Sequence, residues 1–372
     1  MVRDIHNTTV CVVGGAGFLG SHLVNHLIND RDCTVIAIDN LVSGRKEYIH
    51  SKAIFEHADI TASENALYQL FKGYDIQYVF NYAAQPYIPL SFNRPSFVFN
   101  TNATGAINVI NAAHDADCKG ILQVSSAEIY GDCGTGATQR IGDEVRHLGE
   151  RICEDDPVAP HSTYGASKAA VDYYCQTAWR ERETPVIALR QFNCVGERET
   201  HPYIIPEIVG QLSAQSGTLA HYTCTRCGEG YFRTWGDLVC PNCREPAPSP
   251  DTPVVRLGNN STRDFLYAGD AVRMAVELLE HGSFGEVYNL GSQDCIKMYD
   301  LAEKIATLMG FSSVQVEEDP SRKRPWEIWH LQSDNTKINS VVKYRPRTPL
   351  DLALLKTIEW YQVNGNKWGW EK

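Results

Sequence analysis

The sequence predicts an α/β fold in which a parallel β-sheet is covered by helices on both faces. Three observations support this fold class. Short β-branched runs alternate with segments of helical periodicity, a glycine-rich turn follows the first of these runs, and the alternation continues through the first half of the chain. The 372 residues are 43% hydrophobic and 21% charged, which suits one large domain with a subdomain or two domains.

The expected elements of the first half alternate regularly between strand and helix. The strands are Thr9–Val13, Thr34–Ile38, Tyr78–Tyr82, Gly120–Ser125 and Val186–Leu189. The helices are Phe18–Ile28, Ala66–Phe71, Asn102–Ala113 and Lys168–Trp179. Strands that are joined through helices in this way run parallel, because each crossover returns the chain to the same edge of the sheet.

The pattern changes after residue 193. Three further helices are expected at Ile204–Leu212, Met298–Met309 and Leu350–Val363, and a cysteine-rich insert at 221–250 ends in a proline-rich linker. We therefore expect a first domain over 1–193, with strand and helix contributions from 255–292, and a smaller C-terminal subdomain over 194–372.

Composition excludes several classes of function. The net charge of −11 argues against a general binder of nucleic acid or of membrane surfaces. The apolar runs are too short to span a bilayer, and the N-terminus lacks the layout of a signal peptide. We expect a cytoplasmic protein, in which an anionic ligand would need local arginines and helix N-termini.

The glycine-rich turn predicts a dinucleotide site. Gly14 allows a tight turn, and Gly17 lets backbone N–H groups approach a pyrophosphate at the start of the helix that contains Gly20. The next strand ends at Asp39, where a carboxylate can accept hydrogen bonds from both ribose hydroxyls of NAD. Asp39 would repel a 2′-phosphate, although Arg45 lies nearby, so we expect NAD as the cofactor.

A second constellation predicts redox chemistry on a hydroxyl group. Tyr164 and Lys168 are four residues apart and share one face of a helix, where the ammonium would lower the pKa of the phenol. Ser126 follows the strand that ends in Val-Ser-Ser and would orient a substrate hydroxyl. Each residue also has a plain structural interpretation, as a strand-end serine, a helix-cap tyrosine or a solvated lysine.

These residues, together with Asp39-Asn40, Asp59-Ile60, Ala83-Ala84-Gln85 and Arg263-Asp264-Phe265, resemble the extended short-chain dehydrogenase/reductases. Within that family, the chain resembles the nucleotide-sugar epimerase/dehydratase branch. The resemblance covers nearly the whole chain except the insert at 221–250 and an enlarged loop at 132–152. It implies a Rossmann-type doubly wound sheet, with an NAD-binding domain over 1–193 and a sugar-nucleotide-binding subdomain over 194–372.

The resemblance also assigns site residues by position. The cofactor residues are Gly14, Gly17, Phe18, Leu19, Gly20, Asp39, Asn40, Asp59, Ile60, Ala83, Ala84, Asn102, Tyr164 and Lys168, which would hold NAD tightly while it is recycled. The substrate residues are Gln85, Asn193, Arg263 and Arg324. A homodimer that packs through the helices beginning near Asn102 and Lys168 is also implied.

Glu128 decides which reaction we favour. A sugar oxidised at C4 has an acidic C5–H, and a carboxylate two positions after Ser126 would point into the same pocket if the segment is extended. We therefore favour 4,6-dehydration of a nucleotide hexose, although many dehydratases of the branch carry Asp where this chain has Ala127. A 4-epimerase, a hexuronate decarboxylase and a non-catalytic NAD-binding protein remain alternatives, as does a purely structural Glu128. Glu199 and His201 are supplementary acid candidates, and His201 alone reads as a surface or packing residue.

The insert carries a pattern typical of metal binding. Cys224 and Cys227 form one knuckle, and Cys240 and Cys243 form a second. Two such pairs provide four thiolates for a closed tetrahedral zinc-ribbon site, with no position left for a catalytic water. We expect structural zinc, with iron or a pair of disulfides as alternatives. The insert could wall the substrate pocket, contact another subunit or be a surface module.

Overall fold

The computed structural model describes residues 3–132, 138–141, 144–147, 151–215, 221–223, 226–228, 230–232, 242–245 and 252–365. Within these ranges, no helix is both long enough and apolar enough to cross a membrane.

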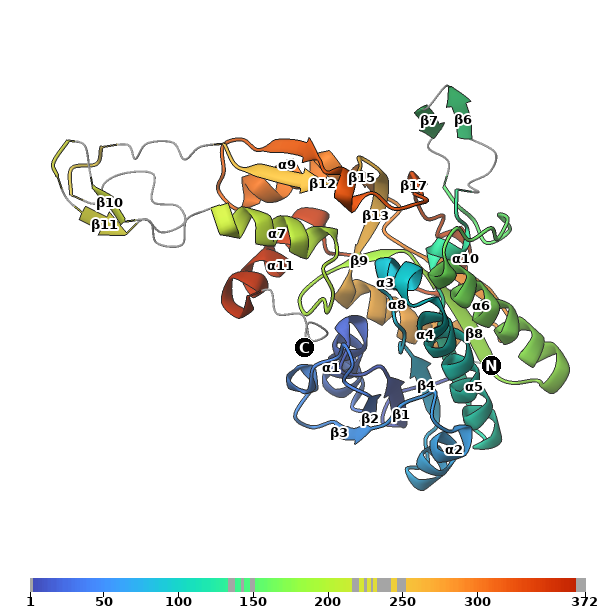
Figure 1. Ribbon diagram of the computed structural model, residues 1–372. Helices are drawn as coiled ribbons and strands as arrows, with labels where there is room; N and C mark the ends of the chain where they lie inside the picture. Colours follow the sequence, from blue (N-terminus) through green and yellow to red (C-terminus); the bar gives the residue numbers. More distant parts are fainter. Residues whose placement is uncertain are drawn as a thin grey trace.

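A seven-stranded, fully parallel sheet forms the centre of the molecule, in the order β14-β8-β5-β4-β1-β2-β3 (Figure 1). Its strands are β1 (Thr9–Val13), β2 (Thr34–Asp39), β3 (Ile54–His57), β4 (Tyr78–Asn81), β5 (Gly120–Val124), β8 (Val186–Gln191) and β14 (Val287–Leu290). Val13 pairs with both Ile38 and Asn81, so the carboxyl ends of β1, β2 and β4 meet at one edge. The strand order reverses at β1, which opens a crevice at that edge.

Helices cover both faces of this sheet, as the sequence predicts for a doubly wound fold. On one face, α1 (Phe18–Arg31) and α8 (Ala268–His281) pack on the strands through a core that includes Leu23, Leu27 and Val276. On the other face lie α2 (Glu64–Gly73), α5 (Ala106–Asp115) and α6 (Thr163–Arg182), with their own buried core. The Rossmann-type arrangement predicted from the sequence is therefore confirmed.

The helix expected at Asn102–Ala113 is longer and less regular than its pattern indicates. After α3 (Ile88–Asn93), α4 (Pro95–Phe99) leads through a π-helical turn (Asn100–Gly105) into α5. A Cβ on Gly105 would approach the Ile60 side chain to 2.6 Å, so this turn packs tightly on the loop after β3. Such turns are frequent at functional sites, and Asn102 lies inside this one.

The C-terminal part builds a smaller subdomain beside the carboxyl edge of the sheet. Its strands are β9 (Asn193–Val195), β12 (Val254–Leu257), β13 (Thr262–Tyr267), β15 (Cys295–Lys297), β16 (Gln315–Glu318) and β17 (His330–Leu331). Its helices are α7 (Ile204–Gln215), α9 (Met298–Leu308) and α11 (Leu350–Asn364), whereas α10 (Thr336–Val341) packs against β14 and α8. A separate apolar core unites α7, α9 and α11. The short pair β10 (His221–Thr223) and β11 (Gly230–Phe232) lies apart from this subdomain, beyond α7, and β6 (Thr138–Ile141) pairs with β7 (Glu144–His147) (Figure 1).

Asp264 ties the subdomain to the sheet. This fully buried residue of β13 accepts backbone hydrogen bonds from Ser292 and Gln293, after β14, at 2.6 and 3.0 Å. Its carboxylate also accepts bonds from the backbone N–H of Ser333 at 3.0 Å and from the Ser333 hydroxyl at 2.5 Å. One carboxylate therefore holds three segments that meet beside the crevice.

Candidate active site

A cavity of about 770 Å³ lies between the carboxyl edge of the sheet and the C-terminal subdomain. Most of the predicted site residues line it. They are Gly14, Gly17, Phe18, Leu19, Gly20, Asp39, Asn40, Ile60, Ala83, Ala84, Gln85, Ser126, Glu128, Tyr164, Lys168, Asn193, Arg263 and Arg324. Residues from both halves of the sequence therefore meet in one space.

Two predicted cofactor residues, Asp59 and Asn102, do not line this cavity. Asp59 is exposed, and its Oδ2 accepts a hydrogen bond from Asn40 at 3.1 Å. Asn102 is fully buried behind the cavity wall, where it accepts a bond from the Gln85 backbone N–H at 2.6 Å and donates one to the Gln85 carbonyl at 3.1 Å. Asn102 therefore fixes the loop after β4 instead of facing a ligand, because the π-helical turn carries its side chain toward that loop.

The structure requires glycine at Gly14 and Gly20 for different reasons, and it leaves more space at Gly17. A Cβ on Gly20 would stand 2.0 Å from the Gly14 carbonyl oxygen, so only glycine lets α1 pack this close to the turn. Gly14 has a φ of +80°, and a Cβ there would meet the Ala83 nitrogen at 2.7 Å. A Cβ on Gly17 would meet only the Gly14 oxygen, at 3.2 Å. Gly17 lines the cavity just before α1 begins. The backbone N–H groups of this helix start are thus available to an anion.

Asp39 ends β2 at the cavity rim. Its Oδ2 accepts the Ala16 backbone N–H at 3.0 Å, and its Oδ1 accepts that of Leu41 at 2.8 Å. Burial raises the pKa of this carboxyl, and the two backbone hydrogen bonds oppose that shift. Each oxygen keeps acceptor capacity for a ribose hydroxyl. The open glycine turn and the oriented Asp39 carboxyl therefore fit an NAD molecule.

Tyr164 and Lys168 share a face of α6, which begins after Ser162; the Ser162 Oγ accepts the Gly165 N–H at 3.0 Å. Lys168 Nζ donates to the Val124 carbonyl at 2.9 Å, and burial lowers the pKa of this lysine to about 8. Burial raises the pKa of Tyr164 to about 12, while a hydrogen bond with Ser126 acts in the opposite direction. The predicted lowering of the phenol pKa by Lys168 is not what the structure shows, because Lys168 is directed at the strand end.

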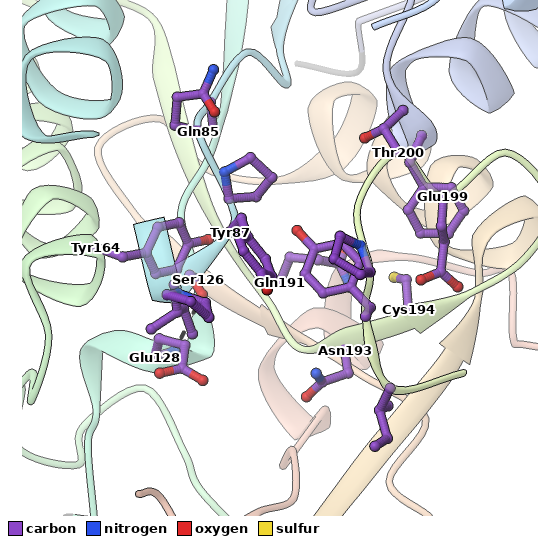
Figure 2. Close-up of a pocket in the computed structure, with 18 of the residues that line it drawn as sticks. Gln85, Tyr87, Ser126, Glu128, Tyr164, Gln191, Asn193, Cys194, Glu199 and Thr200 are labelled. Carbon is purple, nitrogen blue, oxygen red and sulfur yellow. Dashed lines mark hydrogen bonds between the residues drawn. The ribbon is translucent and has the colours of Figure 1, made fainter. Parts of the chain in front are cut away.

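Glu128 lies on the same side of the cavity as Ser126 and Tyr164, as Figure 2 shows. The predicted location is right, but the predicted reason is not. The segment is a 3₁₀ turn (Ala127–Ile129) instead of an extended strand, and the Ser126 Oγ caps it by accepting the Glu128 N–H at 3.2 Å. Burial raises the pKa of Glu128, and the charges of Arg324 and Arg263 oppose the shift. The result is a carboxylate that is more basic than an exposed one.

The C-terminal subdomain adds the two predicted arginines to the cavity wall. Arg263 on β13 is buried and pairs with Glu327 at 3.1 Å. Arg324 approaches the same carboxylate at 3.9 Å. Asn193 begins β9, which pairs with β13. These groups line the same cavity as Ser126, Glu128 and Tyr164 and can bind an anion there.

Sequence reasoning did not single out two further polar residues of the cavity wall, Tyr82 and Gln191. Both line the cavity, and the buried Tyr82 hydroxyl and Gln191 Oε1 have no hydrogen-bond partner within the described ranges. Gln191 Nε2 donates to the Leu290 carbonyl at 3.0 Å, which fixes the amide. Their positions directly after β4 and at the end of β8 were the available signal, since ligands of such folds bind at strand ends.

The two supplementary acid candidates, Glu199 and His201, differ in whether they line the cavity. Glu199 lines the cavity and is 3% exposed. His201 is buried, stacks on Tyr87 with 5.9 Å between ring centroids, and is not a surface residue. Burial lowers the pKa of His201 to about 4, so this imidazole is a neutral packing group at physiological pH.

The predicted zinc ligands are described only in part. Cys224 and Cys240 lie outside the described residues, and the described part of the chain contains no cluster of three or more potential metal ligands. Cys227, in the first knuckle, accepts a hydrogen bond from Asn242 Nδ2, in the second knuckle, at 3.8 Å. Arg226 and Glu245 form an ion pair at 3.0 Å. These contacts bring residues 226–227 next to residues 242–245.

Comparison with protein families gives two matches. The model of the NAD dependent epimerase/dehydratase family matches residues 10–291, and that of GDP-mannose 4,6 dehydratase matches residues 246–357. Among curated proteins, a dTDP-D-glucose 4,6-dehydratase of Mus musculus is 26% identical and covers 96% of this chain and 90% of its own. A putative UDP-glucose 4-epimerase of Methanocaldococcus jannaschii is also 26% identical, over 95% of this chain and 99% of its own.

Solved structures of both enzyme types share the fold. A UDP-glucose 4-epimerase of Thermotoga maritima, with UDP-glucose, has a TM-score of 0.76 at 23% identity and covers 96% of this chain and 99% of its own. A dTDP-glucose 4,6-dehydratase of Streptomyces venezuelae, with NAD bound, has a TM-score of 0.75 at 24% identity and covers 96% and 97%. Overall similarity thus does not separate the two reactions. Because the family model spans most of the residues that build the sheet and the cavity, the chain belongs to the NAD dependent epimerase/dehydratase family of enzymes.

Proposed function

We propose that the protein is a 4,6-dehydratase of a nucleoside-diphosphate hexose that keeps NAD bound through its catalytic cycle. The observation that carries this proposal is the location of Glu128 beside Ser126 and Tyr164, on one side of the cavity. An epimerase needs groups at the C4 hydroxyl only. A dehydratase also needs a base for the C5 proton, and a buried carboxylate of raised pKa suits that task.

The residues divide the reaction between them. Tyr164, hydrogen bonded to Ser126, takes the proton of the C4 hydroxyl as its phenolate, a form that the positive charge of an oxidised nicotinamide would favour against the effect of burial. NAD, held by the glycine turn and Asp39, would supply the hydride acceptor for C4 and the hydride donor for C6. Oxidation at C4 makes the C5–H acidic, and Glu128 removes that proton. Since Ala127 carries no proton donor, Glu128 passes the proton to the departing C6 hydroxyl, which leaves as water. When the hydride returns to C6, the proton that Tyr164 took from the C4 hydroxyl is delivered to C5, so the net change is loss of one water.

The substrate anion is assigned to the subdomain wall. We infer that Arg263, Arg324 and Asn193 contact the diphosphate of the sugar nucleotide, because two guanidinium groups and an amide converge there. Gln85, whose backbone is fixed by Asn102, lines the part of the cavity near the predicted sugar position.

The absence of a carboxylate at position 127 favours a second candidate, an NDP-sugar 4-epimerase. Ala127 is buried and leaves Glu128 without a neighbouring acid in the 3₁₀ turn. In that case Glu128 would shape the pocket without removing a proton.

Product analysis separates these candidates. Purified enzyme is incubated with UDP-, GDP-, dTDP- and CDP-linked hexoses and hexuronates, and the products are analysed by mass spectrometry and NMR. Loss of one water establishes dehydration. An isobaric product inverted at one carbinol establishes epimerisation, and loss of carbon dioxide from a hexuronate establishes decarboxylation. A protein that binds NAD and converts none of these donors would contradict both candidates.

We further propose a structural zinc ion in the insert, held by Cys224, Cys227, Cys240 and Cys243. The described residues support it through the contacts of Asn242 with Cys227 and of Arg226 with Glu245, which bring the knuckles together. Four thiolates suit a closed structural site.

A homodimer is our last proposal in this section. The helices α4 and α6 carry exposed aromatic side chains, since Phe99 is 40% exposed and Tyr173 is 54% exposed. Such side chains on neighbouring helices suit a helix-to-helix contact with a second copy.

A further inference from the structure

The side chain of Glu199 has no evident structural purpose in the described part of the chain. It is 3% exposed, and its Oε1 has no hydrogen-bond partner. Among the described residues, the backbone N–H of Gly196 is the one group that donates to this carboxyl. Its polar neighbours Cys194, Tyr203 and Tyr361 are neutral groups. A buried polar atom without a partner costs about 1–3 kcal/mol, so a ligand is the simplest reason to keep one.

The place of Glu199 indicates which ligand. Glu199 lines the cavity, and Figure 2 shows it across the cavity from Tyr164, Ser126 and Glu128. It is therefore remote from the groups that act on the sugar. Gly196, which donates to Glu199, lies against the Phe18 ring, since a Cβ at Gly196 would stand 3.3 Å from that ring. Phe18 begins α1 in the dinucleotide turn, so Glu199 belongs to the cofactor half of the cavity.

An ionised carboxylate would be unfavourable in this half, because a pyrophosphate would repel it and burial would leave it unpaired. A neutral carboxylic acid instead has an O–H to donate. We propose that Glu199 is a protonated hydrogen-bond donor to the bound dinucleotide and thereby helps to retain NAD between turnovers. This inference rests on the proposed NAD site but not on which sugar reaction takes place there.

Two substitutions separate donation from packing. E199Q keeps the shape and a donor, whereas E199M keeps the volume and removes the donor. E197Q is the matched control, because Glu197 is in the same loop, accepts from the Tyr267 hydroxyl at 3.2 Å and does not line the cavity. The affinity for NAD is measured by calorimetry on protein stripped of its cofactor, and melting temperatures are recorded with and without NAD.

We expect E199Q and E197Q to bind NAD within about twofold of the unsubstituted protein, and E199M to bind about tenfold more weakly, as for loss of one hydrogen bond. Stripped E199M should melt at the same temperature as the unsubstituted protein or higher, because its buried orphan oxygen is gone. Unchanged NAD affinity in E199M, equal weakening in E199Q and E199M, or a lower melting temperature of stripped E199M would overturn the proposal. If the unsubstituted protein itself binds no NAD, the proposed function fails with it.

Discussion

Arg263 and Glu327 form an ion pair on the cavity wall, with 3.1 Å between Nη2 and Oε1 and side chains that are 8% and 11% exposed. Asn259 Nδ2 donates to the second carboxylate oxygen at 2.7 Å. The arginine assigned to the substrate diphosphate is thus held in place by protein groups before any substrate binds. A buried guanidinium needs such a partner, because an unpaired buried charge is costly.

Breaking this pair should affect stability and substrate binding separately. R263M leaves the buried Glu327 carboxylate with the more distant Arg324, at 3.9 Å, and with Asn259, which we expect to lower the free energy of unfolding by up to about 3 kcal/mol. R263M/E327M should regain that stability, yet keep a KM for the sugar nucleotide about tenfold above normal. Urea unfolding and steady-state kinetics measure the two effects. R256M, which removes an exposed pair with Glu317, is the control, and a normal KM in the double variant would refute a diphosphate role for Arg263.

The role of Glu128 predicts a specific defect in E128Q. Dehydration should slow by about 10²–10⁴-fold, because a general base is lost. Exchange of the C5 hydrogen with solvent deuterium, followed by NMR, should be lost in the same proportion, while the NAD content of the purified protein stays unchanged. E303Q, on the exposed face of α9, should behave as the unsubstituted enzyme. Undiminished C5 exchange in E128Q would exclude Glu128 as the base.

The same carboxylate should determine the acid limb of the pH profile. Because burial raises the pKa of Glu128, kcat/KM should fall as the pH drops through a value above the ordinary value of 4.5 for glutamate. The proton-free form is the active one, so activity is complete above this pKa and lost below it. Arg324 opposes the shift, so R324M should move the acid limb to higher pH, whereas R256M should not. An acid limb that stays in place in R324M would argue that another group titrates.

The insert should contain one zinc ion per chain. Metal analysis of C227S and C243S should show loss of zinc, because a closed site needs all four thiolates. Extraction with a chelator then tests whether the insert matters for function. If NAD content, substrate affinity and assembly are unchanged in the zinc-free protein, the insert is a surface module and not a wall of the pocket.

The proposed homodimer predicts a soluble monomer after one substitution. F99E places a charge where an exposed ring lies on α4, and it should halve the mass measured by light scattering. V363E, at an exposed position of α11, should leave the mass unchanged. A mass that is the same for F99E and the unsubstituted protein would place any interface elsewhere.

The main outline of the fold is readable from sequence because its signals are local. Thr9–Val13 forms a strand with the predicted bounds, and the glycine turn and Asp39 lie where a strand–turn–helix–strand unit must place them. The short edge strand Ile54–His57 was not predicted, since it is only half buried and carries little apolar pattern. The π-helical turn was also missed, because one extra residue per turn leaves no clear mark in the periodicity.

Site residues could be predicted from the sequence where their residue types occur at a recognisable spacing along the chain. Ser126, Tyr164 and Lys168 were found through their spacing, and all three line the cavity. The pKa of Tyr164 was misjudged, because the direction taken by the Lys168 ammonium depends on the Val124 carbonyl, which lies on another element. Orphan oxygens such as Gln191 Oε1 are defined by what surrounds them in space, and no sequence pattern reports that.

The Asp264 carboxylate affects how the subdomain can separate from the central sheet during unfolding. Ser292, Gln293 and Ser333 all depend on this one side chain for a backbone hydrogen bond. Releasing the subdomain would leave those donors, and the carboxylate itself, without partners. Separation of the subdomain from the sheet therefore breaks all of these hydrogen bonds together, which couples the two halves. A ligand that binds in the cavity between the two halves would therefore stabilise both of them.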